Sequence, residues 1–347
     1  MDRPRHRAFL PAFLGAIFSV WLPGSAHSEP PGFELPLDCL TGPDCFVQKY
    51  VDHAPNGAYR DYRCGSLSAD GHKGTDFRLR DFRMMERGIP VRAAASGTVV
   101  KTRDGMPDVH MGLVGKDAVF DRGLGNAVVI DHGDGWRSIY GHLRRSSIAV
   151  TPGQRVASGE RIGVVGLSGL TEFPHVHFQI DHYGKPVDPF TGTQSAQSDA
   201  CAKPRRVSKR VSKGASLWRK NALKALPYRR AFLLHSGFSD KPMKRTALQY
   251  GLYDRDQLPA TARNLLFGVF FAGVRAGDAY RLRFFDPGGG VIFDKSGTFP
   301  NHNGVRFLTG GKTKRTQPWP TGHYRAKFEL RGSTGPILDI VRSIEIR

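Results

Sequence analysis

The feature that most limits how this chain can fold is a series of short β-type segments between residues 61 and 190. Segments such as "GTVVKT", "NAVVIDHG", "WRSIYGHL" and "HVHFQID" are rich in β-branched and aromatic residues and are bounded by glycine, proline or aspartate. No convincing amphipathic helix interrupts them. We therefore predict an antiparallel β domain over residues 61–200, and we expect the long connection at 101–125 to wall a groove.

A second β region follows towards the C-terminus. "AYRLRFFD", "HYRAKFELR" and "RSIEIR" alternate apolar and polar residues, and glycine- and proline-rich turns such as "DPGGG" and "WPTG" separate such segments. Period-two alternation is typical of strands that bury one face. We predict an Ig-like β-sandwich over residues 216–347. It contains no evident cluster of titratable residues, so an accessory role is expected. The whole chain is thus predicted to be all-β.

The charge is unevenly distributed between these regions. The net charge is +20, and residues 203–230 contain eleven Lys or Arg and no acid. We interpret residues 201–215 as a basic linker, either simply solvated or acting as a tether to an anionic envelope polymer. No nucleic-acid partner is expected, because the sequence contains no DNA- or RNA-binding motif.

The N-terminus resembles a secretory signal peptide. Arginines precede a short apolar run, about 15 residues long, and small residues then allow cleavage after Ala26 or Ser28. We assign residues 1–28 to the signal peptide, with an uncleaved anchor as the alternative, and residues 29–60 to an irregular N-terminal segment. The mature chain is then expected to lack a transmembrane helix and to be periplasmic or secreted.

Four cysteines are consistent with an oxidising compartment. The short sequence "LTGPD" between Cys39 and Cys45 favours one disulfide, which leaves Cys64 to pair with Cys201. Three pairings are possible in principle. Free thiols or a metal site are the alternatives, although the spacing shows no zinc-ribbon pattern.

Two histidines one residue apart stand out in "EFPHVHFQID". If this segment is a strand, His175, His177 and Gln179 share one face, and the apolar residues between them share the other. Such a pair could serve one site, but two histidines on a solvated strand face are the commoner explanation when no other motif supports them.

Two further motifs precede this pair. In "GHKGTDF", His72 and Asp76 would lie about 13 Å apart at Cα in a straight strand, so only a bend, which Gly74 permits, would bring them together. A histidine and a carboxylate are common zinc ligands. In "IYGHL", His142 lies near the end of a predicted strand.

Taken in order, these motifs resemble a known family. "GHKGTDF", "VRAAASGTVV", "GNAVVIDHGDGW", "IYGHL", "VTPGQRVASGERIGVVGLSG", "PHVHFQI" and "PVDP" are similar to the motifs of lysostaphin-type zinc endopeptidases of bacterial peptidoglycan, peptidase family M23. The resemblance covers residues 62–190. It implies an antiparallel lysostaphin-like domain, and it suggests that the bond cleaved is D-alanyl–diaminopimelyl.

The resemblance also implies roles for five residues. His72, Asp76 and His177 match the zinc ligands, and His142 and His175 match the two histidines beside the metal. Three protein ligands leave a position for the water that attacks the peptide. One histidine can take a proton from that water, and the other can support the oxyanion or protonate the leaving amine; the sequence does not say which does which.

We therefore expect an exported zinc-dependent endopeptidase that hydrolyses peptide cross-links of peptidoglycan. All five matching positions are intact, which favours activity. The alternative is a catalytically silent wall-binding or amidase-regulating protein that keeps the zinc site. His132 lies in the turn "IDHGDG" and is expected to be structural, whereas the other histidines, among them His53, have no evident partner in the sequence.

Overall fold

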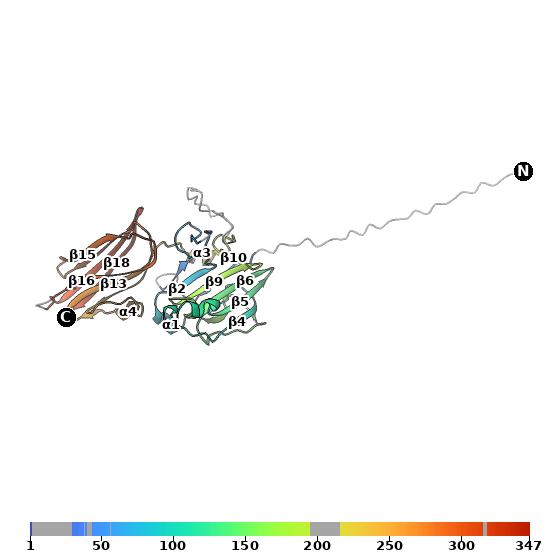
Figure 1. Cartoon of the computed structure of the whole chain (residues 1–347), viewed down its shortest axis with the longest axis horizontal. Helices are drawn as coiled ribbons and strands as arrows, with labels where there is room; N and C mark the ends of the chain where they lie inside the picture. The colour runs from blue at the N-terminus through green and yellow to red at the C-terminus, as the bar shows by residue number, and fades with distance from the viewer. Residues whose placement is uncertain (2–29, 38, 40–43, 56, 195–215, 315–317) are drawn as a thin grey trace.

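The computed structural model describes residue 1 and residues 30–37, 39, 44–55, 57–194, 216–314 and 318–347 (Figure 1). Strands dominate it and the helices are short, so the all-β prediction is confirmed. The predicted signal peptide, Cys201 and the predicted basic linker lie outside the described residues. No described helix combines the length and the apolar character needed to cross a bilayer.

An eight-stranded sheet forms the first unit, and every strand pair in it is antiparallel. The sheet runs in the order β1 (Cys45–Lys49), β2 (Thr75–Leu79), β9 (His175–His182), β6 (Trp136–Leu143), β5 (Asn126–Gly133), β4 (Gly97–Arg103) and β7 (Arg155–Val156), and β10 (Lys185–Val187) pairs with β9. A separate two-stranded sheet joins β3 (Pro90–Arg92) to β8 (Arg161–Val164). The apolar side chains of β9 are fully buried, as the alternation predicted: Val176, Phe178 and Ile180.

Short helices connect these strands. Strand β2 leads into α1 (Phe82–Arg87), which the Asp81 side chain caps by accepting a hydrogen bond from the Met84 N–H. The 101–125 connection is not a bare loop, since it contains the end of β4, the helix α2 (Met111–Val114) and the 3₁₀ helix η1 (Asp117–Arg122). Its Asp108 carboxylate accepts hydrogen bonds from the backbone N–H groups of Leu167 and Arg145. These bonds hold the connection against the segment that precedes β9.

Segments on both sides of the predicted domain also pack into it. Phe33 and Trp218 form a parallel bridge, and both side chains are buried in the core of the first unit. The Leu217 N–H donates a hydrogen bond to the Pro189 carbonyl, while Gln194 bridges Val187. The first unit therefore includes residues that the sequence pattern placed in the irregular segment and in the sandwich, among them α3 (Lys220–Ala225).

The disulfide prediction is confirmed for the first pair. Cys39 and Cys45 are bonded, with their Cα atoms 6.0 Å apart. Cys64 is also disulfide-bonded, while its predicted partner Cys201 lies outside the described residues. The pairing of these two cysteines stays a prediction.

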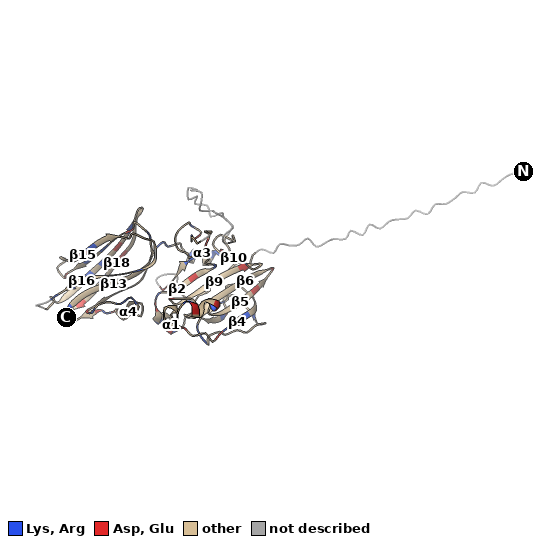
Figure 2. Ribbon diagram, in the orientation of Figure 1, with Lys and Arg blue, Asp and Glu red and all other residues tan. Residues whose placement is uncertain are grey.

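Two packed sheets form the second unit. One contains β11 (Phe232–Ser239), β13 (Asn264–Val274) and β16 (Asn303–Thr313), and the other runs in the order β12 (Gln257–Leu258), β18 (Gly335–Ile346), β17 (Gly322–Gly332), β14 (Ala279–Phe285) and β15 (Val291–Thr298). The core between them contains Phe271, Leu282 and Phe328. The Ig-like class of this sandwich stays a prediction. Charged residues of both signs occur in both units (Figure 2).

The second unit rests against one edge of the first. Residues on the outer face of β11 and β13 form a further apolar cluster with Phe46 of the edge strand β1, whose ring lies 4.0 Å from that of Phe232. Helix α4 (Arg245–Gln249) lies close to α1 (Figure 1). At this contact Phe82 stacks on Tyr250 with 4.6 Å between ring centroids, and the Arg83 guanidinium donates a hydrogen bond to the Gly251 carbonyl over 2.6 Å. The contact thus lies immediately after β2.

Candidate metal centre

Strands β2 and β9 bring the predicted site residues together. They pair antiparallel, with Asp76 opposite His177 and Arg78 opposite His175. Directly opposed residues of an antiparallel pair project their side chains from the same face of the sheet. Asp76 and His177 are therefore neighbours on one face, although 101 residues separate them in sequence.

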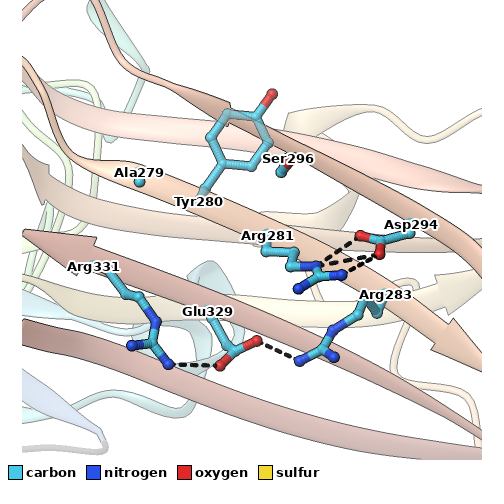
Figure 3. Close-up of a pocket in the computed structure, with 8 residues that line it drawn as sticks. All are labelled: Ala279, Tyr280, Arg281, Arg283, Asp294, Ser296, Glu329 and Arg331. Atoms are coloured by element: carbon cyan, nitrogen blue, oxygen red, sulfur yellow. Dashed lines mark hydrogen bonds and ion pairs between the residues drawn. The ribbon is translucent and has the colours of Figure 1, made fainter.

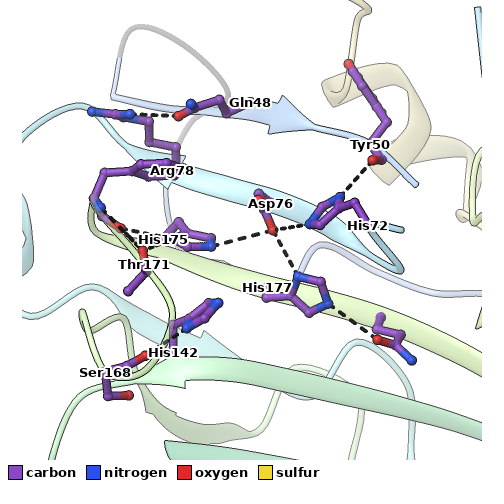
Figure 4. Close-up of polar contacts among 12 residues, drawn as sticks. Gln48, Tyr50, His72, Asp76, Arg78, His142, Ser168, Thr171, His175 and His177 are labelled. Atoms are coloured by element: carbon purple, nitrogen blue, oxygen red, sulfur yellow. Dashed lines mark hydrogen bonds and ion pairs between the residues drawn. The ribbon is translucent and has the colours of Figure 1, made fainter. Parts of the chain in front are cut away.

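Three potential ligand atoms converge on this face (Figure 4). Both His72 Nε2 and His177 Nδ1 lie 3.0 Å from Asp76 Oδ1. One ligand atom from each of the three residues lies within 4.8 Å of the others. The expected bend between His72 and Asp76 is present, because residue 74 is a bend immediately before β2.

The remaining nitrogen of each ligand histidine has an oxygen partner. His72 Nδ1 lies 2.8 Å from the Tyr50 carbonyl oxygen, and His177 Nε2 lies 3.4 Å from Gln179 Oε1. Gln179 is oriented by its own amide, which donates a hydrogen bond to Asp181 Oδ1 over 2.7 Å. These oxygens can accept the ring proton of a neutral imidazole once a cation takes the place of the hydrogen bonds to Asp76. The nitrogens that face Asp76 then carry lone pairs.

This donor set fits a metal cation. Burial alone would raise the pKa of the Asp76 carboxyl, but the charges of His72 and His175 and its hydrogen bonds to the histidines lower that pKa well below its usual range. A cation between them could replace these hydrogen bonds, because it would attract both the ionised carboxylate and the lone pairs of the two nitrogens. Two imidazoles and a carboxylate are a common ligand set for zinc.

His142 and His175 lie beside this group. Their rings are 4.4 Å apart, and the side chains of both are buried. His142 Nδ1 lies 2.7 Å from the Ser168 carbonyl oxygen, and His175 Nδ1 lies 2.9 Å from that of Phe173. These acceptors assign the proton to Nδ1 and leave Nε2 able to accept one. His175 Nε2 lies 3.5 Å from Asp76 Oδ1.

The position of His142 is fixed by its backbone as well. Its φ of 59° lies in the left-handed region, which is uncommon for a residue other than glycine and is found mainly where surrounding structure enforces it. Its N–H donates to the Leu124 carbonyl, and its own carbonyl accepts from the Gly166 N–H. Burial, and then the charges of the neighbouring histidines, lower the pKa of His142 well below its ordinary value. The ring is therefore neutral at pH 7.

The five residues predicted from the motifs thus lie together, and the structure adds partners that the motifs did not predict. Backbone carbonyls of Tyr50 and Ser168 orient two of the histidines, and backbone atoms leave no signature in a sequence. Gln179 was predicted to share their face, but its contact with His177 depends on a register known only from the structure. Elsewhere, buried His53 lies 2.6 Å from Asp188 of the "PVDP" segment, a partner that its sequence neighbours gave no reason to expect.

Gly74 tests how tightly the site is packed. A Cβ atom at this position would lie 2.6 Å from His177 Nε2 and 2.7 Å from the Phe178 carbonyl oxygen, so close approach rather than an unusual φ requires glycine here. We expect Gly74→Ala to displace His177 and to weaken zinc binding by about 10- to 100-fold, measured by competition with a chromophoric chelator. Gly123→Ala is the matched control, because its Cβ would meet only ordinary contacts. Equal affinities for the two variants would contradict this account.

Protonation of His132 makes the stability of the protein depend on pH, without involving the proposed metal. The ring nitrogens of His132 lie 2.7 Å from the Ser96 carbonyl oxygen and 2.8 Å from Ser138 Oγ. Burial lowers the pKa of His132 below its ordinary value of 6.5, and the hydrogen bond that its ring donates to the Ser96 carbonyl oxygen opposes this shift. Its contribution to stability is therefore complete above pH 6.5 and is lost as the pH falls below it, because the unfolded chain then binds the proton more readily. Urea unfolding at pH 5 and pH 7.5 should show a smaller difference for His132→Gln than for the wild type.

A polar hollow on the second unit is a weaker candidate for a functional site (Figure 3). It lies over β14, β15 and β17, and its three arginines are paired with two carboxylates. Arg281 forms an ion pair with Asp294, while Arg283 and Arg331 both contact Glu329. The lining residues include no histidine or cysteine, so the chemistry of the described residues is concentrated at the first unit.

Comparisons with known proteins concern the same part of the chain. Residues 70–189 match the model of peptidase family M23. An uncharacterized metalloprotease of Haemophilus influenzae is 34% identical over 133 residues, which are 37% of this chain and 23% of that protein. Peptidoglycan DD-endopeptidase ShyA of Vibrio cholerae is 36% identical over 34% of this chain and 22% of its own length. DD-carboxypeptidase/endopeptidase Mpg of Neisseria meningitidis is 34% identical over 34% of this chain and 22% of its own length.

Solved structures give matches of limited extent. A zinc-containing peptidase from Vibrio cholerae is 24% identical, with a TM-score of 0.32 over 46% of this chain and 39% of that one. The catalytic domain of lysostaphin from Staphylococcus simulans is 26% identical, with a TM-score of 0.26 over 40% of this chain and 85% of that one. The chain spans about a quarter of the length of the curated relatives it matches.

Proposed function

Because residues 70–189 form a domain of peptidase family M23, we propose that the protein is an exported zinc-dependent endopeptidase that hydrolyses peptide cross-links of bacterial peptidoglycan. Relatives named as a peptidoglycan DD-endopeptidase and a DD-carboxypeptidase/endopeptidase support this substrate class. The observation that carries the proposal is the convergence of three ligand atoms next to two histidines whose Nε2 atoms can accept protons.

The proposed zinc ligands are His72 through Nε2, Asp76 through Oδ1 and His177 through Nδ1. A zinc ion held there would lower the pKa of a bound water and polarise the scissile carbonyl. The oxygen partners of the two ring nitrogens, on Tyr50 and Gln179, keep each imidazole in the tautomer that ligation needs.

His142 and His175 are the proposed proton carriers. Each ring is held through Nδ1 by a carbonyl oxygen, so its Nε2 can accept a proton from the attacking water or, once protonated, donate one to the leaving amine. Low exposure of both rings excludes bulk water and strengthens their hydrogen bonds to a developing oxyanion. One of these two histidines would accept the proton of the attacking water, and the other would donate a proton to the leaving amine.

The location of the protein is part of the same proposal. Residues 1–28 would direct export, and the mature protein would act in the periplasm or outside the cell. Relatives named as lipoprotein NlpD/LppB homolog of Pseudomonas aeruginosa and outer membrane antigenic lipoprotein B of Histophilus somni support an envelope location. The basic residues within 203–230 would increase association with an anionic envelope polymer, an effect that salt should weaken.

Digestion of purified peptidoglycan sacculi tests the proposal. The full chain, purified after export and loaded with zinc, should convert cross-linked muropeptide dimers to monomers, and mass spectrometry of the soluble products would identify the bond cut. The His142→Ala and His177→Ala variants should release no monomers. Stoichiometric zinc binding without cleavage of any bond would instead favour the wall-binding or amidase-regulating alternative.

A further inference from the structure

Arg78 is a buried cation beside the candidate metal centre. It lies on β2 two residues after Asp76, so its side chain projects from the same face, and it is directly opposite His175 in the register of β2 and β9 (Figure 4). Only 2% of its surface is exposed. A cation at this depth next to a proposed catalytic histidine requires an explanation, since burying a charge is costly unless it is paired.

The described residues do not supply that pairing. Arg78 Nη1 donates a hydrogen bond to Gln48 Oε1 over 2.7 Å, which is a neutral acceptor. Its Nε has no hydrogen-bond partner in the described part of the chain, and no described carboxylate lies within ion-pair distance of the guanidinium. Arg245 of the second unit adds a further positive charge in its surroundings. Part of the guanidinium's donor capacity is thus left unused.

Aromatic rings surround the guanidinium. Its Cζ lies 4.2 Å from the centroid of the Phe173 ring and 5.8 Å from that of Phe270 on β13. The Phe173 ring is also 4.6 Å from the His175 ring, so it is close to both the cation and the proposed catalytic residue. Phe173 is half-buried, whereas Arg78 is buried. A ligand of the guanidinium would therefore have to displace the Phe173 side chain.

We infer that Arg78 is a specificity-determining residue that binds a free carboxylate on the substrate residue next to the scissile bond. The inference rests on the proposed peptidase function and specifies its substrate further. A guanidinium presents two parallel N–H donors that match the two oxygens of a carboxylate, and it cannot lose its charge as readily as a lysine. The substrate class is therefore a peptide with an unamidated carboxylate at that residue, and Phe270 makes the second unit one wall of the subsite.

One carboxylate of the chain itself competes with this assignment. Glu172 is exposed, adjoins Phe173 and is close enough to act electrostatically on Arg78. If Glu172 served as the counter-ion, the guanidinium would have a structural role only. Removing the charge of Glu172 would then change the stability of the protein without changing which peptides it binds.

The inference can be tested by binding alone, without hydrolysis. The affinities of two probes are measured by calorimetry on the zinc-loaded full chain carrying His142→Ala. The probes are a cross-linked muropeptide dimer and the same dimer with the carboxylate next to the cross-link converted to a carboxamide. We expect the carboxylate probe to bind at least tenfold more tightly. Adding Arg78→Gln should abolish this ratio, whereas adding Glu172→Gln or Arg80→Gln should preserve it.

Several results would overturn the inference: equal binding of the two probes, no binding of either, or a ratio unchanged by Arg78→Gln.

Melting temperatures distinguish a role of Arg78 in ligand binding from a role in stabilising the fold. Arg78→Met should melt at or above the temperature of its parent, because an incompletely paired buried charge is removed, while a structural arginine would make it less stable. Arg78→Lys, which keeps the charge, should retain a reduced ratio. Failure to digest sacculi together with a preserved probe ratio would reject the proposed peptidase function and leave the carboxylate subsite standing.

Discussion

His177→Ala is expected to prevent stoichiometric zinc binding and to slow cross-link hydrolysis by ~10³-fold or more, because the metal supplies several kcal/mol of transition-state stabilisation. His177 Nδ1 is one of only three protein atoms proposed to hold the ion. Asp76→Asn should have a similar effect, since the amide keeps the shape of the side chain but loses its charge. Zinc content by atomic absorption and turnover of a purified muropeptide dimer would be measured on each variant.

His182→Ala on the same strand is the matched control. His182 stacks on Trp136, with 4.0 Å between ring centroids, and lies at the end of β9 farthest from the ligands. It should keep one zinc per chain and nearly full activity. If His177→Ala retained both the metal and the activity, the assignment of Asp76 and its neighbours as ligands would have to be abandoned.

Alanine at position 142 or 175 is expected to have a different effect, leaving zinc bound while lowering kcat by about 10²- to 10⁴-fold, the usual range for loss of a general acid or base. Each of these rings is held by a carbonyl oxygen through Nδ1 and contributes none of the three converging ligand atoms. The depressed pKa of His142 keeps that ring able to accept a proton at neutral pH. Metal content and single-turnover rates, measured together, distinguish this result from loss of a ligand.

The control for these two variants is His110→Ala. His110 lies in the connection near the site, where its ring accepts a hydrogen bond from the Gly112 N–H. Its loss should disturb only that connection and cost little activity. Full activity in either His142→Ala or His175→Ala would show that the affected ring carries no proton in the rate-limiting step.

The candidate site could be predicted from sequence to the extent that it depends on local geometry. The period of a strand places His175 and His177 on one face wherever that strand lies, so their proximity could be predicted without the fold. The approach of His72 to Asp76, in contrast, does not follow from the period of a strand. It depends on the packing of Gly74 against the His177 ring, a contact between residues far apart in sequence.

The fold could be predicted where alternation was strong and not where a few apolar residues are isolated among polar and proline-rich neighbours. Strands β14, β17 and β18 of the second unit follow from alternation, whereas β13 of its other sheet is buried on both faces and does not alternate. Phe33 and Trp218 instead lie in segments with no clear period, and they become core residues only because β2 and β9 present Phe77 and Phe178 to them. Tertiary contacts of this kind leave no local pattern.

Contacts of the residues that flank 195–215 show how this basic stretch is attached to the rest of the chain. Just before it, Gln194 bridges Val187, and just after it, the Leu217 N–H is bonded to the Pro189 carbonyl, so both of its ends are attached to one domain. The described residues on both sides of 195–215 are thus anchored to the first unit, and the second unit begins only after α3. Packing at Phe46 and Phe82 sets the separation of the two units. A connection attached at both ends to one unit can be lengthened at a cost of only about 0.6 kcal/mol per doubling, or changed in charge, without altering that separation.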